Sequence, residues 1–261
     1  STPSRRRSNM STAIVTGASA GLGMSFARQL RDYFPGVDRL WLIARRRDRL
    51  EKLAGELEGL ETEILSLDLC DKEDLKKLGE KLAAERPEVS LLINNAGCGY
   101  LGNLGDGDVE RQVRMTDLNV TALTAVTHMV LPHMPNGGRI INVSSIASFC
   151  PNPRMTVYSS TKAYVSAFTR GLSTELRGRG IAVTAVCPGP MATEFLKIGH
   201  IQGNSRTFEM LPYCDPDKVV AGTLAASRAG KVVYTPRAFY KFYRVLAKLL
   251  PQAMMVKFSK C

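Results

Sequence analysis

Short apolar runs alternate with amphipathic segments along almost the whole chain. Most of these runs are continuously apolar, as expected for parallel strands that are covered on both faces. The pattern predicts seven strands, at Thr12–Thr16, Leu40–Ile43, Glu63–Leu67, Leu91–Asn94, Arg139–Val143, Ile181–Val186 and Val232–Thr235.

The segments between these runs show helical spacing of their leucines and helix-capping residues. Strands that alternate with helices predict an α/β fold, a doubly wound seven-stranded parallel sheet whose ligands bind at the carboxyl ends of the strands. We expect a single domain over residues 11–235. The helix signals are Leu50, Leu53, Leu57 and Leu60; Leu75, Leu78 and Leu82 behind the N-cap Asp71; and a helix from Asp215-Pro216 to Gly230.

Composition narrows the class of protein. The 261 residues are 44% hydrophobic and 23% charged, which is typical of a soluble globular protein. The six cysteines are far apart and form no C-x-x-C pair, so we expect reduced thiols and a cytoplasmic protein. No metal site is predicted, because the three histidines have no partners at metal-ligand spacing.

The net charge of +11 is concentrated at the two ends of the chain. Nine basic residues and no acid follow from Lys218 onward, and Arg5, Arg6 and Arg7 add three more, which leaves 11 − 9 − 3 = −1 for the rest. Residues 1–10 are predicted to be a disordered basic tail, although a targeting segment would have a similar composition.

A glycine-rich turn follows the first predicted strand and leads into a helix. Such a turn brings the backbone close to a pyrophosphate, which then lies at the helix N-terminus. A plain strand–helix turn is the alternative, but the strand before it and the helix after it favour dinucleotide binding. The turn residues expected at the cofactor are Gly17, Ser19, Gly21, Leu22 and Gly23.

The second strand is followed by arginines instead of the acid that would bind the ribose 2′-hydroxyl of NAD. A guanidinium suits the 2′-phosphate of NADP by both charge and geometry. Arg45 and then Arg46 therefore predict NADP(H), with a solvated basic helix start as the alternative.

Tyr158 and Lys162 are four residues apart in a helical pattern, so both side chains project from one face. A neighbouring ammonium is expected to lower the pKa of the phenol and fit it for acid–base catalysis. Ser145 follows the fifth strand, 158 − 145 = 13 residues earlier, where its hydroxyl could polarise a substrate carbonyl.

Together these residues resemble the short-chain dehydrogenases/reductases in their compact single-domain form. The resemblance covers about residues 11–235 and rests on six motifs in the correct order. These are Thr16–Gly23, Asp68-Leu69, Asn94–Gly97, Asn119 in Leu118-Asn119-Val120, Ser145 with Tyr158 and Lys162, and Pro188-Gly189 with Thr193.

The resemblance implies a Rossmann fold and a role for each motif. Tyr158 would be the proton donor, Ser145 would orient the carbonyl, Lys162 would hold the nicotinamide ribose, and Asn119 would anchor a water. It also implies a homodimer or homotetramer through the helices of Asn119 and Tyr158. The remaining implied cofactor contacts are Asp68, Leu69, Asn95, Ala96, Gly97, Pro188, Gly189, Met191 and Thr193.

Two positions depart from the common pattern. Ala20 stands where NADP-preferring members often have a basic residue, so the prediction of NADP(H) depends on Arg45 and Arg46. Ser144 directly precedes Ser145, and only the spacing to Tyr158 favours the second serine.

The last part of the chain is expected to define the substrate. Residues 190–214 are long and apolar enough for a substrate lid, or for simple packing on the body. Residues 236–261 form a basic amphipathic extension that could cap the pocket, pack on a second subunit or make peripheral membrane contact. No motif for nucleic acid accompanies the charge.

The function expected is NADP(H)-dependent interconversion of a ketone and a secondary alcohol, on a hydrophobic hydroxysteroid, 3-oxoacyl or other lipid-like substrate. A non-catalytic NADP(H)-binding sensor or docking protein is the alternative, although it would have no chemical need for the four residues Asn119, Ser145, Tyr158 and Lys162.

Overall fold

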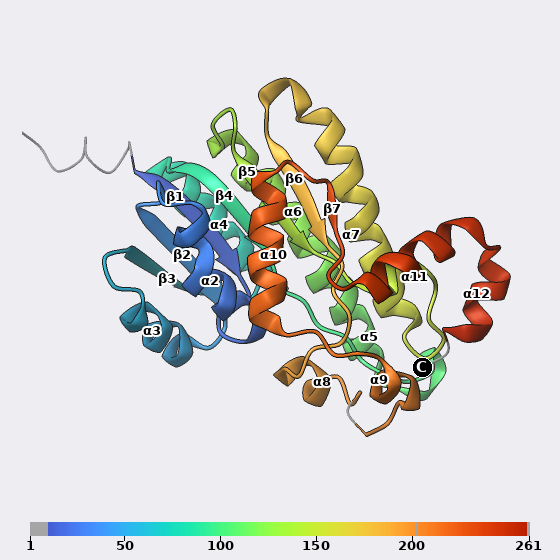
Figure 1. The fold of residues 1–261 in the computed structure, drawn as a ribbon. Helices are drawn as coiled ribbons and strands as arrows, with labels where there is room; N and C mark the ends of the chain where they lie inside the picture. The colour runs from blue at the N-terminus through green and yellow to red at the C-terminus, as the bar shows by residue number, and fades with distance from the viewer. Residues whose placement is uncertain (1–9, 202, 260–261) are drawn as a thin grey trace, which may run out of the picture.

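A seven-stranded, entirely parallel sheet runs through the centre of the computed structural model, which describes residues 10–201 and 203–259 (Figure 1). The strand order is β3-β2-β1-β4-β5-β6-β7. The order reverses between β1 and β4, so a ligand crevice is expected beyond their carboxyl ends. The strands are β1 (Ser11–Thr16), β2 (Arg39–Ala44), β3 (Glu61–Ser66), β4 (Glu88–Asn94), β5 (Arg139–Val143), β6 (Ala182–Val186) and β7 (Val233–Tyr234).

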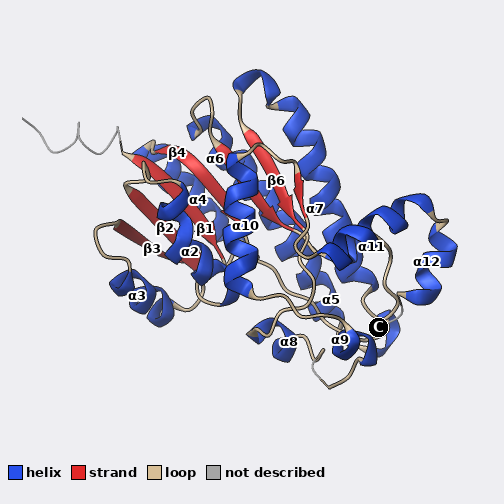
Figure 2. Cartoon of the chain, viewed as in Figure 1, coloured by secondary structure: helices blue, strands red, loops and turns tan. Residues whose placement is uncertain are grey.

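Helices cover both faces of the sheet (Figure 2). One face carries α2 (Gly21–Tyr33), α3 (Arg47–Glu56) and α10 (Pro216–Arg228). The other carries α4 (Lys72–Glu85), α6 (Leu123–Val130) and α7 (Thr156–Glu175).

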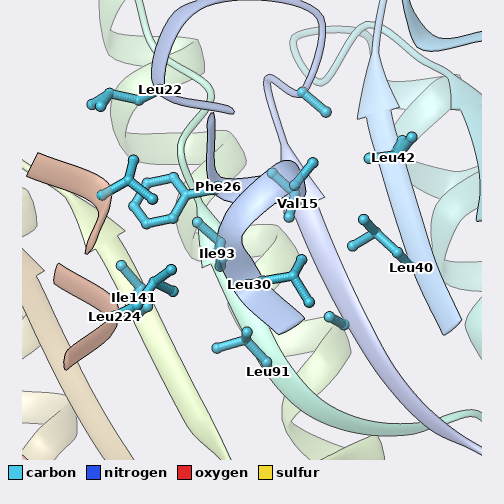
Figure 3. Packing of buried hydrophobic residues seen from close by; sticks show 14 of the residues in the cluster. Val15, Leu22, Phe26, Leu30, Leu40, Leu42, Leu91, Ile93, Ile141 and Leu224 are labelled. Atoms are coloured by element: carbon cyan, nitrogen blue, oxygen red, sulfur yellow. The ribbon is translucent and has the colours of Figure 1, made fainter. Parts of the chain in front are cut away.

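Alternate residues of the strands point into one or the other of two apolar cores, which lie on opposite faces of the sheet. Val15 packs on the α2 side with Phe26 and Leu30 (Figure 3), whereas its neighbour Ile14 belongs to the core beneath α4 and α6. Side chains alternate across a strand, and both faces here are buried. This double burial explains the continuous apolar runs in the sequence.

All seven predicted strands are present, but one predicted helix is too long. Leu57 and Leu60 continue the leucine spacing, yet α3 ends at Glu56. Leu57 is the C-cap residue, and Gly59 adopts a φ of +69° in the turn that follows. Leu60 is still buried, because the turn folds it back onto the same core.

A chain of buried polar side chains fixes the helices to the sheet. The Asn94 amide donates to Asn142 Oδ1 and to Thr127 Oγ1 at 2.9 Å each, and the Asn142 amide donates to Thr169 Oγ1 at 3.0 Å. These bonds join β4 and β5 to α6 and α7. They set the position of α7, the helix that carries Tyr158 and Lys162.

Further helices lie beyond the carboxyl edge of the sheet. They are α5 (Val109–Thr116), α8 (Glu194–Ile198), α9 (Arg206–Met210), α11 (Ala238–Leu249) and α12 (Gln252–Phe258). The last two project beside α7 in Figure 1, and Pro251 separates them. The helix expected from Pro236 begins two residues later, after Arg237.

The predicted basic tail, residues 1–10, lies outside the described residues except for Met10. Within the described ranges, none of the helices combines the length and the apolar character needed to cross a bilayer.

Candidate active site

A cavity of about 690 Å³ occupies the carboxyl edge of the sheet. It extends from the glycine turn past the end of β2 at one side to α11 and α12 at the other. All of the predicted site residues line it except Gly23 and Asn119. Those two lie behind its wall, as their contacts show.

The glycine turn is built for close backbone approach. Gly17 and Gly21 have φ values of +66° and +51°, and a Cβ on Gly17 would lie 2.8 Å from the Cα of Ala96. A Cβ on Gly23 would lie 2.2 Å from the carbonyl oxygen of Gly17. The Asn95 amide donates to the carbonyls of Thr16 and Gly17 at 3.0 and 3.1 Å, which holds the turn against β4.

The N-terminus of α2 faces the cavity at this turn. Ala20 is its N-cap and provides no capping side chain, and the first turn contains no acid. The first N–H groups of a helix need partners and favour an anion. Ser19 and Leu22 line the cavity on either side. The glycine turn and the N-terminus of α2 together form a cradle that fits a dinucleotide pyrophosphate.

Two arginines at the end of β2 have different surroundings. The Arg45 side chain is 65% exposed, and its Nη1 lies 3.9 Å from Asp68 Oδ2. Arg46 donates to Ser19 Oγ at 3.2 Å and forms an ion pair of 2.9 Å with Glu194, which also binds Arg49 at 2.7 Å. Arg45 is therefore available to a ligand, whereas Glu194 already occupies Arg46.

The end of the cavity near Arg45 contains a further arginine, Arg114, that the sequence does not reveal. Arg114 Nη2 donates to both oxygens of Asp68, at 3.0 and 2.7 Å. Burial tends to raise the pKa of the Asp68 carboxyl, but Arg114, the Cys70 amide and Arg45 outweigh it and lower that pKa. In the sequence Arg114 looks like any polar position on an amphipathic helix. Leu69 lies beside this pair on the cavity wall.

Asn119 lies in a π-helical turn, Asp117–Ala122, between α5 and α6. Such turns are rare and occur often at functional sites. Its amide accepts from the Cys98 N–H at 2.9 Å and donates to the Cys98 carbonyl at 2.8 Å and to Thr161 at 3.0 Å. Asn119 therefore joins the loop after β4 to α7. Gly97 permits this, because a Cβ there would lie 3.0 Å from Asn119 Oδ1.

The structure distinguishes the two adjacent serines. Ser144 is buried, with its hydroxyl 2.9 Å from the Lys162 carbonyl and 2.8 Å from Ser166 Oγ, so it holds α7 in place. Ser145 accepts from the Ala147 N–H at 3.1 Å and is the hydrogen-bond partner that lowers the pKa of Tyr158. Ser145 is thus the serine beside the phenol.

The expected effect of Lys162 on Tyr158 is wrong for this structure. Burial raises the pKa of Tyr158 to about 12, and Ser145 offsets only part of that shift. Lys162 Nζ instead donates to the Val143 carbonyl at 2.9 Å and lies 5.7 Å from the centre of the phenol ring. Burial also lowers the pKa of Lys162 to about 8. At neutral pH Tyr158 is a protonated phenol, ready to donate.

The segment after β6 closes the cavity above these residues. The Pro188 carbonyl accepts from the Ile146 N–H at 3.0 Å, and Met191 and Thr193 continue the wall. Gly189 lies against the ring of Tyr240, where a Cβ would come within 2.3 Å of the ring carbons. The Tyr240 hydroxyl donates to the Pro212 carbonyl at 2.7 Å.

Beyond Tyr158 the cavity becomes an apolar chamber. Phe195 of α8 contacts the Tyr158 ring at a centroid distance of 5.6 Å, and Tyr243 of α11 lies 6.1 Å from Phe149. Ser259 closes the far end: its hydroxyl donates to the Pro151 carbonyl at 2.7 Å, and its main-chain carbonyl accepts from the Asn152 amide at 3.0 Å. The structure places the C-terminal extension over the cavity, where it caps the pocket, one of the three roles considered for it. The further apolar lining is Met155, Leu196, Ile198, Phe208, Leu211, Phe239, Leu246, Leu250 and Met255.

Among the described residues no group of three or more histidine, cysteine or acidic side chains could hold a metal ion. His200 lies outside the cavity wall, with its Nε2 3.3 Å from Arg111.

Comparison with known proteins agrees with this arrangement. The family model described as short chain dehydrogenase matches residues 11–199. Very-long-chain 3-oxoacyl-CoA reductase of Anas platyrhynchos is 34% identical over 197 residues, which cover 71% of this chain and 61% of that protein. The chain thus spans about three fifths of the length of this curated relative.

Solved structures match over more of the chain. A short-chain dehydrogenase from Sphingobium yanoikuyae in complex with NADPH has a TM-score of 0.77 at 30% identity, covering 94% of this chain and 98% of that one. The bulky-bulky ketone specific alcohol dehydrogenase from Comamonas testosteroni has a TM-score of 0.72 at 29% identity, covering 94% and 96%. With the family match and this geometry, the chain belongs to the short-chain dehydrogenases/reductases, oxidoreductases that act on CH–OH and C=O groups with nicotinamide cofactors.

Proposed function

We propose that the chain is an NADP(H)-dependent oxidoreductase that interconverts a bulky apolar ketone and its secondary alcohol. The observation that carries this proposal is the position of Tyr158. Its phenol lies where the cradle of the glycine turn meets the apolar chamber under α11 and α12. A carbonyl carbon bound there would have the proton donor on one side and apolar walls around its substituents.

The chain supplies the proton and the orientation of the substrate. A bound nicotinamide supplies the hydride. Tyr158, with a pKa of about 12, keeps its proton at neutral pH and can donate it to the carbonyl oxygen as negative charge develops there. The Ser145 hydroxyl beside it can donate a hydrogen bond to the same oxygen. Lys162 lines the same cavity and would supply positive charge to the ribose of a bound cofactor.

The preference for NADP(H) is supported by Arg45, which is exposed at the end of β2, and by Arg46 beside Ser19. The loop between β2 and α3 contains no acid, and the first acid after β2 is Asp48, in the first turn of α3. A 2′-phosphate near Arg45 would receive a charge-assisted hydrogen bond. The aromatic and aliphatic lining of the chamber supports a bulky substrate. The similar alcohol dehydrogenase from Comamonas testosteroni is specific for bulky-bulky ketones.

The test is NADPH consumption with a panel of steroid, 3-oxoacyl and small ketones, with NADH in parallel. We expect turnover on large apolar ketones, faster with NADPH. Tyr158→Phe should lower kcat at least ~100-fold, because the proton donor is lost, and leave the affinity for NADPH nearly unchanged. Tyr164→Phe is the matched control, since this second tyrosine of α7 is 37% exposed, its hydroxyl lies 2.8 Å from Thr124 Oγ1, and it does not line the cavity.

Tight NADPH binding without turnover on any ketone would instead support a cofactor-binding sensor. Retention of most activity by Tyr158→Phe would remove the assigned proton donor.

A further inference from the structure

Helix α11 exposes an apolar stripe on its outer side. Phe239, Phe242, Val245 and Leu249 are 52, 66, 53 and 76% exposed. Their spacing of three and four residues places them along one face of the helix. A contiguous exposed stripe of this size marks an interaction site more often than a random surface.

The inner side of the same helix is already occupied. Tyr240 is fully buried against Gly189, and Leu246 and Leu250 line the cavity. Phe242, Val245 and Leu249 are exposed and do not line the cavity, unlike Phe239, which contributes to its wall. Something other than the fold of the described residues must account for the apolar character of the stripe.

Positive charge runs beside the stripe. Arg237, Lys241 and Lys248 are exposed, and successive positions lie four and seven residues apart, on one flank of α11. The chain contains no acidic residue after Asp217, so no carboxylate of this segment neutralises these cations. A surface that offers both hydrocarbon and negative charge would match the apolar stripe and the cations beside it.

We propose that the outer face of α11 docks on an anionic phospholipid bilayer. Phe242, Val245 and Leu249 enter the boundary between headgroups and acyl chains, while Lys241 and Lys248 reach the lipid phosphates. Phe239 is both exposed and part of the cavity wall, so docking brings the mouth of the apolar chamber to the bilayer surface.

Pairing of this face with a second copy of the chain is less favourable physically. A two-fold interface brings the same patch of each subunit together. The cations beside the stripe would then oppose the equivalent cations, with no acid of the segment to separate them. An anionic bilayer meets no such repulsion.

The experiment is sedimentation of the full chain with vesicles of mixed phosphatidylcholine and phosphatidylglycerol, and with vesicles of phosphatidylcholine alone. We expect binding to the mixed vesicles that weakens as salt is raised, and much weaker binding to the neutral ones. Lys241→Glu with Lys248→Glu should weaken binding more than ~20-fold, about fivefold for each cation lost and more for the reversed charge.

Phe242→Glu with Leu249→Glu should also reduce binding at least ~100-fold, because two carboxylates would enter the apolar boundary. Leu104→Glu is the matched control, since Leu104 is 61% exposed on a separate 3₁₀ turn, Leu104–Asp106, and its change should leave binding unaltered. Thermal unfolding of each variant verifies that it is folded. None of these readouts depends on turnover, so the docking surface and the proposed reaction can fail independently.

Absence of binding to anionic vesicles would overturn the proposal, as would equal binding to neutral ones. If Phe242→Glu with Leu249→Glu converts an oligomer into a monomer in sedimentation velocity while the wild type ignores vesicles, the face pairs with a second copy instead. Capture of an acidic protein without vesicle binding would also overturn it.

Discussion

At the scale of single residues, burial determines the chemistry of the site. Tyr158 and Lys162 are 7% and 4% exposed, and burial favours the neutral form of each. It raises the pKa of the phenol to about 12, which the bond to Ser145 only partly offsets. It lowers the pKa of the ammonium to about 8, which Cys98 and Cys187 only partly offset. The result is a pair in which Lys162, not Tyr158, titrates near physiological pH.

This pair predicts a pH profile for ketone reduction. Below pH 8 Lys162 is charged and Tyr158 protonated, so kcat/KM should be flat from about pH 6 to 7.5. Above pH 8 the ammonium loses its proton while the phenol keeps its own, and kcat/KM should fall about tenfold per unit. Steady-state rates across this range are the measurement. Lys162→Arg, which stays charged, should be slower but lack the fall; a flat wild-type profile to pH 10 would contradict the role of Lys162.

Glu194 predicts a change in cofactor affinity. Its carboxylate binds Arg46 and Arg49, whose hydrogen bonds lower its pKa and keep it charged. The Glu194→Gln change removes a competitor of the 2′-phosphate for Arg46. Because the pair is about two fifths exposed, the gain in NADPH affinity should be modest, up to about fivefold, with NADH unaffected.

Fluorescence titration with both cofactors measures this effect. Glu51→Gln, which breaks the exposed pair with Arg47 on α3, is the control and should change neither affinity. Weaker NADPH binding by Glu194→Gln would mean that this carboxylate helps to close the site.

At the scale of elements, a close contact between a ring and a glycine backbone helps to hold α11 on the body. The Tyr240 ring lies directly against the backbone of Gly189, and Arg237 begins the helix from a positive φ of +62° while donating to the Tyr213 carbonyl. The roof of the chamber thus depends on a residue with no side chain in the segment that follows β6.

The Gly189→Ala change should therefore disturb the roof. A Cβ would lie 2.3 Å from the ring of Tyr240, which is fully buried and cannot move without shifting α11. We expect a loss of about 1–3 kcal/mol in the free energy of unfolding and a higher KM for large ketones. Urea denaturation and steady-state kinetics measure both.

Gly171→Ala is the matched control, because Gly171 lies within α7 and nothing approaches its Cβ position within 4 Å. It should stabilise the protein by up to ~1 kcal/mol through helix propensity. An unaltered Gly189→Ala protein would show that α11 is not held at this contact.

At the scale of the whole molecule, one cavity unites distant parts of the chain. Its lining begins at Gly17 and ends at Ser259, and it includes residues that follow β1, β2, β4, β5 and β6. A ligand bound there would contact segments from both halves of the sheet. Cofactor binding should therefore stabilise the fold as a unit.

The expected outcome is a rise in the melting temperature with NADPH. At a ligand concentration of about 100 times Kd, the gain in the free energy of unfolding is about 2.7 kcal/mol. Calorimetry with NADPH and NADH measures it, and we expect the larger shift with NADPH. A shift with neither cofactor would contradict the assignment of the cradle.

The sequence by itself was sufficient for the fold and the family. Doubly buried strands produce continuous apolar runs, and motifs such as Thr16–Gly23 and Tyr158 with Lys162 are local in sequence, so both can be read without coordinates. The end of α3 could not be predicted from the leucine spacing, because Leu57 and Leu60 pack on the core from a turn and not from the helix.

Only the tertiary structure decided features that depend on contacts between distant segments. It paired Arg114 with Asp68 and Arg46 with Glu194, and it separated Ser144 from Ser145 by their partners. It also reversed the expected shift of the Tyr158 pKa. The physical reason is the same in each case: burial, and the partners a polar group meets when buried, arise from chain segments that are far apart in sequence and meet only in the folded protein.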